Sequence, residues 1–316
     1  MHQDRNLGRD ETITPVGLLG TPGTPGRDGD PAPPAPRIAV VLGSGGFRGP
    51  AHVGVLSRLR DLRVPLHAMV GCSVGSLVAA YYGAVGLDVE GLLENALQTT
   101  PLGVLAHALT LWLGEERARF LGRWAGPVRA RLALLDRSDF RNLHHGLGMI
   151  GFLIHDRRRG ERIFVVTGRE RGFRLSEAVR ASSRLPLVFP TLRKEVEGLE
   201  RHLVDGAFSA PSPVIHAVAA PVSATHVLVV DLTGSRRRAR HSELSRWQAL
   251  LGDRLLIVRP RPSWRPARWG STSGVIAWHE AGRRAIGERE AARLRSWLGA
   301  AAPVRVAAVA ETVPVG

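Results

Sequence analysis

The chain has 316 residues, of which 44% are hydrophobic and 22% are charged, a balance typical of a soluble globular protein with a sizeable core. One cysteine, Cys72, excludes an internal disulfide, and no apolar run reaches the length of a spanning helix, so we expect a cytoplasmic protein. The net charge of +15 is carried by arginine except for Lys194, and we interpret it as scattered surface charge and expect no specific nucleic-acid binding.

The first part of the chain, residues 1–36, is rich in Gly, Pro and Thr and poor in apolar side chains, which predicts a disordered tail. It has no apolar segment of the kind found in secretory signals, so we expect none. We expect a folded domain over residues 37–235. Residues 236–316, rich in Arg and Trp, are expected to complete the same domain.

A buried strand is predicted at Ile38–Leu42, a continuous apolar run. The glycine-rich stretch Gly43–Gly49 follows, and Pro50 favours the start of a helix. A glycine loop before a helix exposes main-chain N–H groups that bind anions. One interpretation of this loop is a dinucleotide site, but Arg48 stands where the dinucleotide-binding sequence pattern requires its third glycine. The other interpretation is an oxyanion hole.

A second strand, Leu66–Val70, leads into the G-x-S-x-G pattern formed by Gly71, Ser73 and Gly75, and a helix is predicted from Val74. This pattern is typical of a tight strand-to-helix turn that exposes a serine hydroxyl. Ser73 is therefore a candidate nucleophile. Two successive strand–helix units predict an α/β fold with a mostly parallel sheet, and both loops then lie at carboxyl ends of strands, where such sheets bind ligands.

Four blocks of this chain resemble the patatin-like phospholipase family. They are the glycine loop and helix start at Gly43–Leu56, the serine turn at Gly71–Gly75, the segment Glu177–Pro190, and the sequence Asp205–Ala207, and together they span roughly residues 37–234. The resemblance implies a three-layer α/β/α fold and cleavage of lipid carboxylic esters, as by a phospholipase A or lysophospholipase. It also implies a Ser-Asp dyad without histidine, and neither cofactor nor metal.

Carried onto this sequence, the resemblance makes Ser73 the nucleophile and Asp205 the group that accepts its proton. The expected oxyanion hole comprises main-chain N–H groups of the loop and of the residue after the nucleophile: Gly45, Gly46, Phe47, Arg48 and Val74. Gly71 and Gly75 shape the turn. The chain departs from the family pattern at Cys72, where threonine is usual, at Val74, where alanine or glycine is usual, and at residues 209–213, which replace an N-x-P sequence. Val74 could narrow the pocket or shift its own N–H.

The remaining elements are predicted from apolar patterning. Several helices are expected over residues 88–135, and we interpret the apolar block Pro101–Leu113, with Leu105, Leu109, Trp112 and Leu113 on one face, as core packing rather than a lipid-facing cover. Further expectations are a hairpin over 149–168, a helix capped by Ser176, strands at 225–231 and 254–258, and one helix over 273–298.

Two rival interpretations remain open. One is a conventional α/β-hydrolase triad of Ser73, Asp231 and either His241 or His279, because that chain order is permitted. The other is a non-catalytic protein of the same fold that binds anionic membrane. The expected partner is a lipid or acyl ester, with peripheral membrane contact suggested by the Arg/Trp-rich residues after 235, where we favour ordinary surface with buried tryptophan. His144 and His145 are interpreted as loop residues, and no oligomeric state is predicted.

Overall fold

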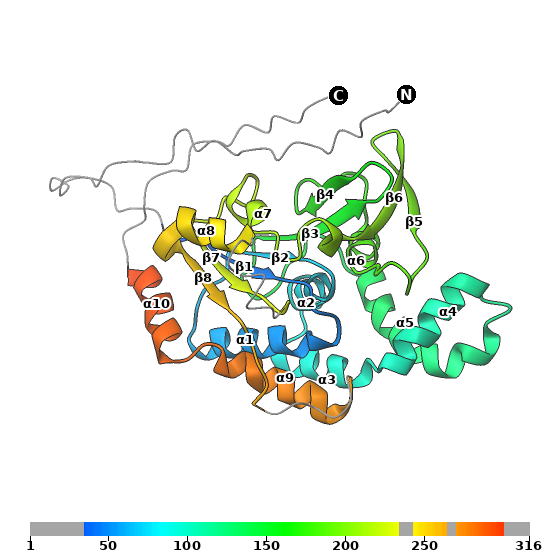
Figure 1. Ribbon diagram of the computed structural model, residues 1–316, viewed down its shortest axis with the longest axis horizontal. Coiled ribbons are helices and arrows are strands. Elements are labelled where there is room, and N and C mark those ends of the chain that lie inside the picture. Colours follow the sequence, from blue (N-terminus) through cyan, green and yellow to red (C-terminus); the bar gives the residue numbers. More distant parts are fainter. Residues whose placement is uncertain (1–34, 234–242, 264–269, 300–316) are drawn as a thin grey trace, which may run out of the picture.

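The computed structural model describes residues 35–233, 243–263 and 270–299. An eight-stranded sheet crosses the molecule in the order β5-β6-β3-β2-β1-β7-β8, with β4 paired to β3 (Figure 1). Residues 1–34 of the predicted tail 1–36 lie outside the described residues, as do the arginines at 236–238. The expected division of the chain into 1–36, 37–235 and 236–316 stays a prediction.

The centre of the sheet is parallel and forms as the sequence predicts. β1 (Ile38–Leu42) lies between β2 (Ala68–Gly71) and β7 (His226–Val230), and β8 (Leu255–Val258) pairs with β7. All five residues of β1 are buried, as expected of an apolar strand covered on both faces. Because β8 joins this sheet, residues beyond 243 share the core of the preceding residues.

One side of the sheet is antiparallel. β3 (Met149–Asp156) runs parallel to β2 and forms the predicted hairpin with β4 (Glu161–Val166). β5 (Leu192–Val196) and β6 (Leu199–Asp205) form a second antiparallel pair, which the sequence analysis did not predict. Exposure alternates along β5 although Arg, Lys and Glu follow one another in its sequence, so one face of this ribbon is solvated.

Helices cover both faces of the sheet, which makes the three-layer α/β/α arrangement. On one face, α1 (Pro50–Asp61), α2 (Val74–Gly83), α3 (Val89–Gln98), α6 (Leu175–Ser182) and α10 (Glu288–Gly299) contribute buried apolar residues to the main core. On the other face, α7 (Ile215–Val218) and α8 (Glu243–Leu251) pack against alternate residues of β1 and β7. The alternation follows from the period of two along each strand.

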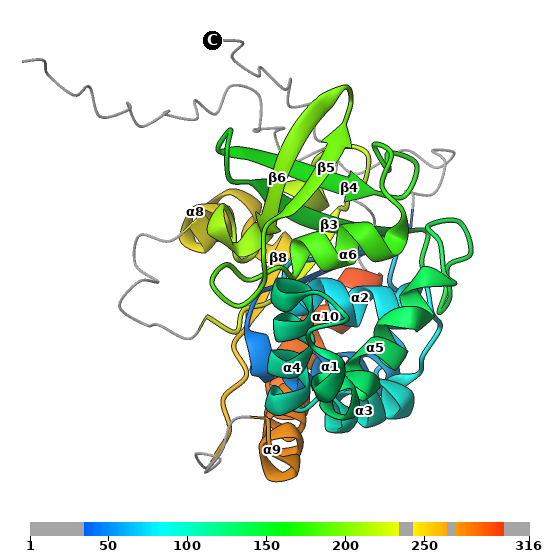
Figure 2. The ribbon, with the colours of Figure 1, turned by 90° about the vertical axis from the view of Figure 1, so that its right-hand side faces the viewer.

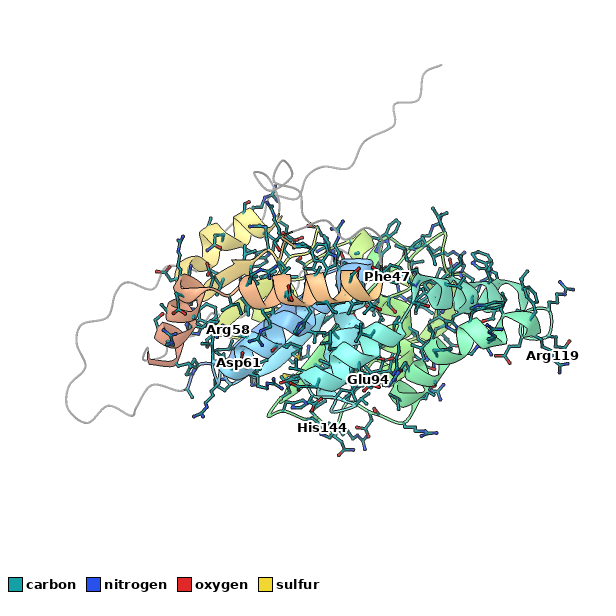
Figure 3. All side chains as sticks on the ribbon, turned by 90° about the horizontal axis from the view of Figure 1, so that it is seen from below. Phe47, Arg58, Asp61, Glu94, Arg119 and His144 are labelled. Atoms are coloured by element: carbon teal, nitrogen blue, oxygen red, sulfur yellow. The ribbon has the colours of Figure 1, made fainter. Side chains whose placement is uncertain are left out.

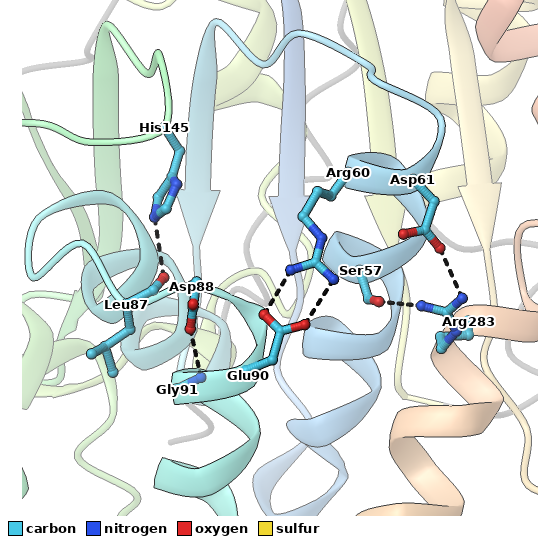
Figure 4. Close-up of polar contacts among 9 residues, drawn as sticks. All are labelled: Ser57, Arg60, Asp61, Leu87, Asp88, Glu90, Gly91, His145 and Arg283. Carbon is cyan, nitrogen blue, oxygen red and sulfur yellow. Dashed lines mark hydrogen bonds and ion pairs between the residues drawn. The ribbon is translucent and has the colours of Figure 1, made fainter.

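Polar contacts join α1 to α3 and to α9 (Thr272–Arg284), as Figure 4 shows. Arg60 donates two hydrogen bonds to Glu90, at 2.6 and 2.8 Å, and Arg283 donates to Asp61 at 2.8 Å and to the Ser57 hydroxyl. These pairs lie at the surface, so they orient the helices more than they stabilise them.

Three expectations about helices were wrong. α6 begins at Leu175 with Arg174 as its N-cap, because Glu177 accepts a hydrogen bond from the Arg174 main chain, and Ser176 lies inside the helix. The C-terminal helix is two helices, α9 and α10, and the Trp297 side chain is buried. The third concerns Pro101–Leu113, which forms α4.

α4 (Pro101–Leu113) pairs with α5 (Gly122–Asp136) at one side of the molecule, the side that faces the viewer in Figure 2. The four side chains interpreted as core, Leu105, Leu109, Trp112 and Leu113, are all exposed. The predicted helix forms, but its apolar periodicity alone does not show whether the apolar face packs in the protein core or faces outward.

Candidate active site

The site forms where two strands meet end to end along one edge of β3. Gly71, the last residue of β2, pairs with Phe152, and Asp205, the last residue of β6, pairs with Ile154. Since β4 occupies the other edge of β3 at both positions, β2 and β6 share an edge. β2 is parallel to β3 and β6 is antiparallel to it, so their carboxyl ends face each other across Leu153.

Ser73 lies at the turn between β2 and α2 in a strained conformation, with φ 57° and ψ −125°. A non-glycine residue rarely adopts this region, and such strain is typical of functional turns. The flanking glycines permit it: a Cβ on Gly75 would lie 1.9 Å from the Leu42 carbonyl oxygen, and one on Gly71 would lie 2.5 Å from the Ser76 Cα. The predicted role of both glycines thus has a steric basis.

Asp205 accepts a hydrogen bond from the Ser73 hydroxyl. Ser73 Oγ donates to Asp205 Oδ2 at 2.6 Å, and the Ala207 main-chain N–H donates to the other carboxylate oxygen at 2.9 Å. The residue is only 1% exposed. Burial raises the pKa of Asp205 above its ordinary value, and the two hydrogen bonds oppose that rise. A carboxylate with a raised pKa is a better base than an exposed one.

Several main-chain N–H groups of the glycine loop donate no hydrogen bond within the described residues. Gly46 has φ 55°, a conformation that favours glycine, and the loop turns so that the Arg48 N–H donates to the Gly45 carbonyl at 3.2 Å. In the described part of the chain, no hydrogen bond engages the N–H groups of Gly46, Phe47 or Val74. Of the predicted oxyanion donors, Arg48 therefore has its main-chain N–H already committed within the loop.

His52 holds the base of this loop and was not singled out from the sequence. It is fully buried, and its Nε2 lies 2.8 Å from the Gly43 carbonyl oxygen. Burial lowers the pKa of His52 to about 4, so the imidazole is neutral near pH 7 and Nε2 carries the proton that it donates. Its place at the third residue of a helix after a glycine loop was the available signal.

Val74, the residue beside Ser73 that departs from the usual family residue, faces the loop. A Cβ on Gly49 would lie 2.4 Å from the Val74 Cγ2 atom, so only glycine at 49 accommodates this valine without a shift. The β-branched side chain thus packs against the end of the glycine loop.

A buried serine cluster supports the turn from behind. Ser182 Oγ donates to the Leu153 carbonyl at 2.6 Å, lies 2.7 Å from Ser76 Oγ, and accepts from the Ser73 N–H at 3.3 Å. Because the carbonyl can only accept, the Ser76 hydroxyl must donate to Ser182. All the hydrogen-bonding capacity of the Ser182 hydroxyl is then used. Serine in a helix gave no sequence signal for this role.

The rival triad does not form in the described residues. Asp231 Oδ2 accepts from Arg259 at 2.9 Å and Oδ1 accepts from Thr233, while Ser73 is bonded to Asp205. His279 lies on α9, which packs mainly against α1 and also contacts α3 and the glycine loop at Gly46–Arg48, and no hydrogen bond among the described residues engages its Nε2. His241 lies outside the described residues.

These features define an α/β protein with a serine and a carboxylate joined at the carboxyl ends of its strands. A sequence model of the patatin-like phospholipase family matches residues 40–218, more than half of the chain. The chain belongs to the patatin-like phospholipase family.

Relatives are similar over parts of their length. Lysophospholipase NTE1 of Cryptococcus neoformans is 46% identical over 63 residues, which is 20% of this chain and 4% of that protein. An NTE family protein of Mycobacterium tuberculosis is 30% identical over 203 residues, 63% of this chain and 50% of the relative. The chain thus spans half or less of the length of these relatives. The crystal structure of VipD from Legionella pneumophila aligns with a TM-score of 0.46 at 12% identity, over 84% of this chain and 68% of that one.

Proposed function

We propose that the chain is a serine acyl hydrolase that cleaves carboxylic esters of lipids, of the phospholipase A or lysophospholipase type, at a membrane surface that it contacts peripherally. The observation that carries the proposal is the 2.6 Å hydrogen bond from Ser73 Oγ to Asp205 Oδ2. Family membership supports the substrate class.

In the proposed reaction, Asp205 takes the proton from Ser73 as Oγ attacks the ester carbonyl. The carbonyl oxygen becomes an alkoxide, which unused N–H groups of Gly46, Phe47 and Val74 stabilise, with that of Gly45 beside them. Asp205 then returns the proton to the departing alcohol, leaving an acyl-serine. Asp205 takes a proton from water as the water attacks that ester, and returns the proton to Ser73 Oγ as the fatty acid leaves.

The test combines fluorophosphonate labelling with ester turnover. We expect the wild type to be labelled and Ser73→Ala to be unlabelled. Asp205→Asn is expected to lose about 10²- to 10⁴-fold in kcat, the usual contribution of a general base. It is also expected to unfold at the same temperature or higher, because the amide replaces a carboxylate whose charged form is disfavoured by burial.

Asp231→Asn is the matched control, since Asp231 is also a buried aspartate after a strand but is bonded to Arg259. It should retain labelling and turnover. Equal loss of activity in Asp231→Asn and Asp205→Asn would favour the triad instead, and equal labelling of Ser73→Ala and wild type would exclude Ser73 as the nucleophile.

A further inference from the structure

Where α4 packs beside α5 the buried side chains are mostly alanines, whereas the large apolar side chains of α4 are exposed. The contact between these helices is built on a small cluster of Ala106, Ala118, Leu121 and Ala125. The exposed side chains of α4 are Leu102, Leu105, Leu109, Leu111, Trp112 and Leu113, with Leu102 56% exposed. Small residues between helices and large apolar ones outside are typical of helices that face lipid.

No charged residue occurs anywhere in α4, although much of it faces outward. A helix of 13 residues is too short to cross a bilayer, and within residues 35–233, 243–263 and 270–299 no helix combines the length and apolar character that crossing requires. An uncharged exposed helix of this length suits a position within the interfacial layer of a membrane.

Basic residues border this apolar face. Between residues 101 and 131 the chain carries five arginines against two glutamates, and Glu115 faces Arg129 at 3.6 Å. Arg119 lies at the outer end of the pair in Figure 3, far from Phe47 of the glycine loop. Arg123 lies over the ring of the exposed Trp124, with 5.6 Å from guanidinium carbon to ring centre. Arginine and tryptophan beside an apolar face match the anionic head groups and the boundary of a bilayer.

The apolar face continues to the active site through residues 184–190. The Trp112 indole N–H donates to the Val188 carbonyl at 2.9 Å, and the Asp205 N–H donates to the Arg184 carbonyl at 3.0 Å. Between these anchors, Leu185 is exposed and Leu187 is 98% exposed at φ 71°, a conformation rare for a bulky residue. Phe208, three residues after Asp205, is exposed as well.

We propose that α4, residues 119–124 and Leu185–Leu187 form a docking surface for an anionic lipid bilayer, which places the Ser73–Asp205 site against the membrane that holds its substrate. The inference rests on the proposed function, because that function explains why the site should lie against a membrane. Binding to vesicles, however, can be measured without any enzymatic activity. The docking surface is defined by Leu102, Leu105, Leu109, Trp112, Phe120, Trp124, Leu185 and Leu187, with Arg119 and Arg123 at its border.

The test measures vesicle binding of the full chain carrying Ser73→Ala, so that no lipid is consumed. Vesicles of phosphatidylcholine alone and of phosphatidylcholine with 30 mol% phosphatidylglycerol are compared by flotation. Leu102→Ser/Leu105→Ser is expected to lower the partition coefficient at least about tenfold, since each leucine withdrawn from lipid loses most of its transfer free energy. The matched control is Leu250→Ser/Ile276→Ser, which removes two similarly exposed apolar side chains from α8 and α9 and should bind within about twofold of its parent.

Charge is tested separately with Arg119→Glu/Arg123→Glu, against Arg289→Glu on α10. The first is expected to lose about tenfold or more on anionic vesicles and little on neutral ones, and added salt should weaken wild-type binding in the same way. Equal binding of the leucine variant and its control would overturn the proposal. So would a dimer in vesicle-free solution that Leu102→Ser/Leu105→Ser dissociates, because the face would then belong to a second copy.

Two activity measurements separate this proposal from the function itself. With Ser73 intact, Leu102→Ser/Leu105→Ser should keep kcat/KM on a water-soluble short-chain ester and lose hydrolysis of vesicle lipid about in proportion to binding. An inactive wild type that still binds anionic vesicles would overturn the proposed function alone. An active enzyme whose vesicle binding is indifferent to α4 would overturn docking alone.

Discussion

Ser182 is hydrogen-bonded to the main chain of Ser73, the proposed nucleophile, but does not itself take part in the proposed reaction. Its hydroxyl joins three elements: the turn at Ser73, α2 through Ser76, and β3 through the Leu153 carbonyl. The strained conformation of Ser73 has to be held by its surroundings, and this hydroxyl accepts a hydrogen bond from the Ser73 N–H at 3.3 Å. Ser182 is therefore a positioning residue.

Removing this hydroxyl should affect the chemical step more than substrate binding. We expect Ser182→Ala to lower kcat about tenfold or more with KM within about twofold, since a misplaced nucleophile loses reactivity without losing the lipid contacts. Steady-state kinetics well below the unfolding temperature measure this. Ser183→Ala is the matched control, because Ser183 Oγ bonds only within its own helix, to Val179. Ser182→Cys should recover part of the loss, whereas a purely structural role would change Tm and leave kcat intact.

At the scale of elements, the glycine loop and the serine turn fit each other through Gly49 and Val74. The loop ends where α1 begins, the turn ends where α2 begins, and the valine side chain fills the space that a Cβ on Gly49 would occupy. A departure from the usual family residue at 74 is thereby accommodated by the neighbouring loop.

This fit predicts a compensating pair. Gly49→Ala should destabilise the fold by about 1 to 3 kcal/mol, the usual cost of overpacking, and should lower kcat by displacing the oxyanion donors. Gly49→Ala/Val74→Ala should restore both, since it removes the methyl group in the way. Thermal unfolding and ester turnover of the two single variants and the double variant measure the coupling. Gly122→Ala, where the added methyl meets open space, is the control; simple additivity of the two substitutions would contradict the explanation.

The sequence was sufficient for the parallel half of the sheet, because continuous apolar runs and glycine turns carry strong local signals there. The strands Ile38–Leu42 and Leu66–Val70, the helix starts at Pro50 and Val74, and the hairpin over 149–168 were predicted and are confirmed, with boundaries within two residues. The ribbon β5–β6 was missed, because its polar side chains lack the periodicity of a buried strand.

The sequence predicted which two residues form the candidate site, Ser73 and Asp205, but not the strand arrangement that brings them together. The family resemblance predicted Asp205 as the proton acceptor. The end-to-end approach of β2 and β6 along β3, by contrast, depends on the antiparallel strand β6, which no local sequence pattern predicted. His52 and Ser182 were missed for a related reason: each acts through a contact with a residue distant in space rather than through a motif. The outward orientation of α4 was missed because a periodic apolar stripe looks the same in a core and at a membrane.

At the scale of the whole molecule, three histidines, one buried and two half-buried, make stability depend on pH. Burial lowers the pKa of His52, His107 and His216 to about 4 each, with nearby arginines adding to the effect at His107 and His216. In the unfolded chain these imidazoles bind protons below pH about 6.5, whereas in the folded chain they stay neutral until pH about 4. Their contribution to the free energy of unfolding is therefore constant above about pH 7.5 and decreases as the pH falls from 6.5 toward 4.

Urea unfolding at pH 7.5 and 5.5 measures this dependence. His52 alone should account for about 1.4 kcal/mol of the decrease at pH 5.5, by the linkage between proton binding and folding. His52→Gln, which keeps an N–H donor without a titrating group, should show a smaller decrease, and the exposed His144→Gln should match the wild type. An identical urea midpoint for the wild type at the two pH values would rule out the neutral state of these side chains.

The hydrogen bond between Ser73 and Asp205 joins residues 132 positions apart in the chain, so during synthesis the serine is made well before its partner. A ribosome adds about 5 to 20 residues per second, so the hydroxyl leaves the exit tunnel roughly ten seconds before the carboxylate exists to activate it. Until β6 has been translated and has aligned along β3, the nascent polypeptide contains an inert alcohol. The proposed ester hydrolysis therefore cannot begin before residue 205 has been translated.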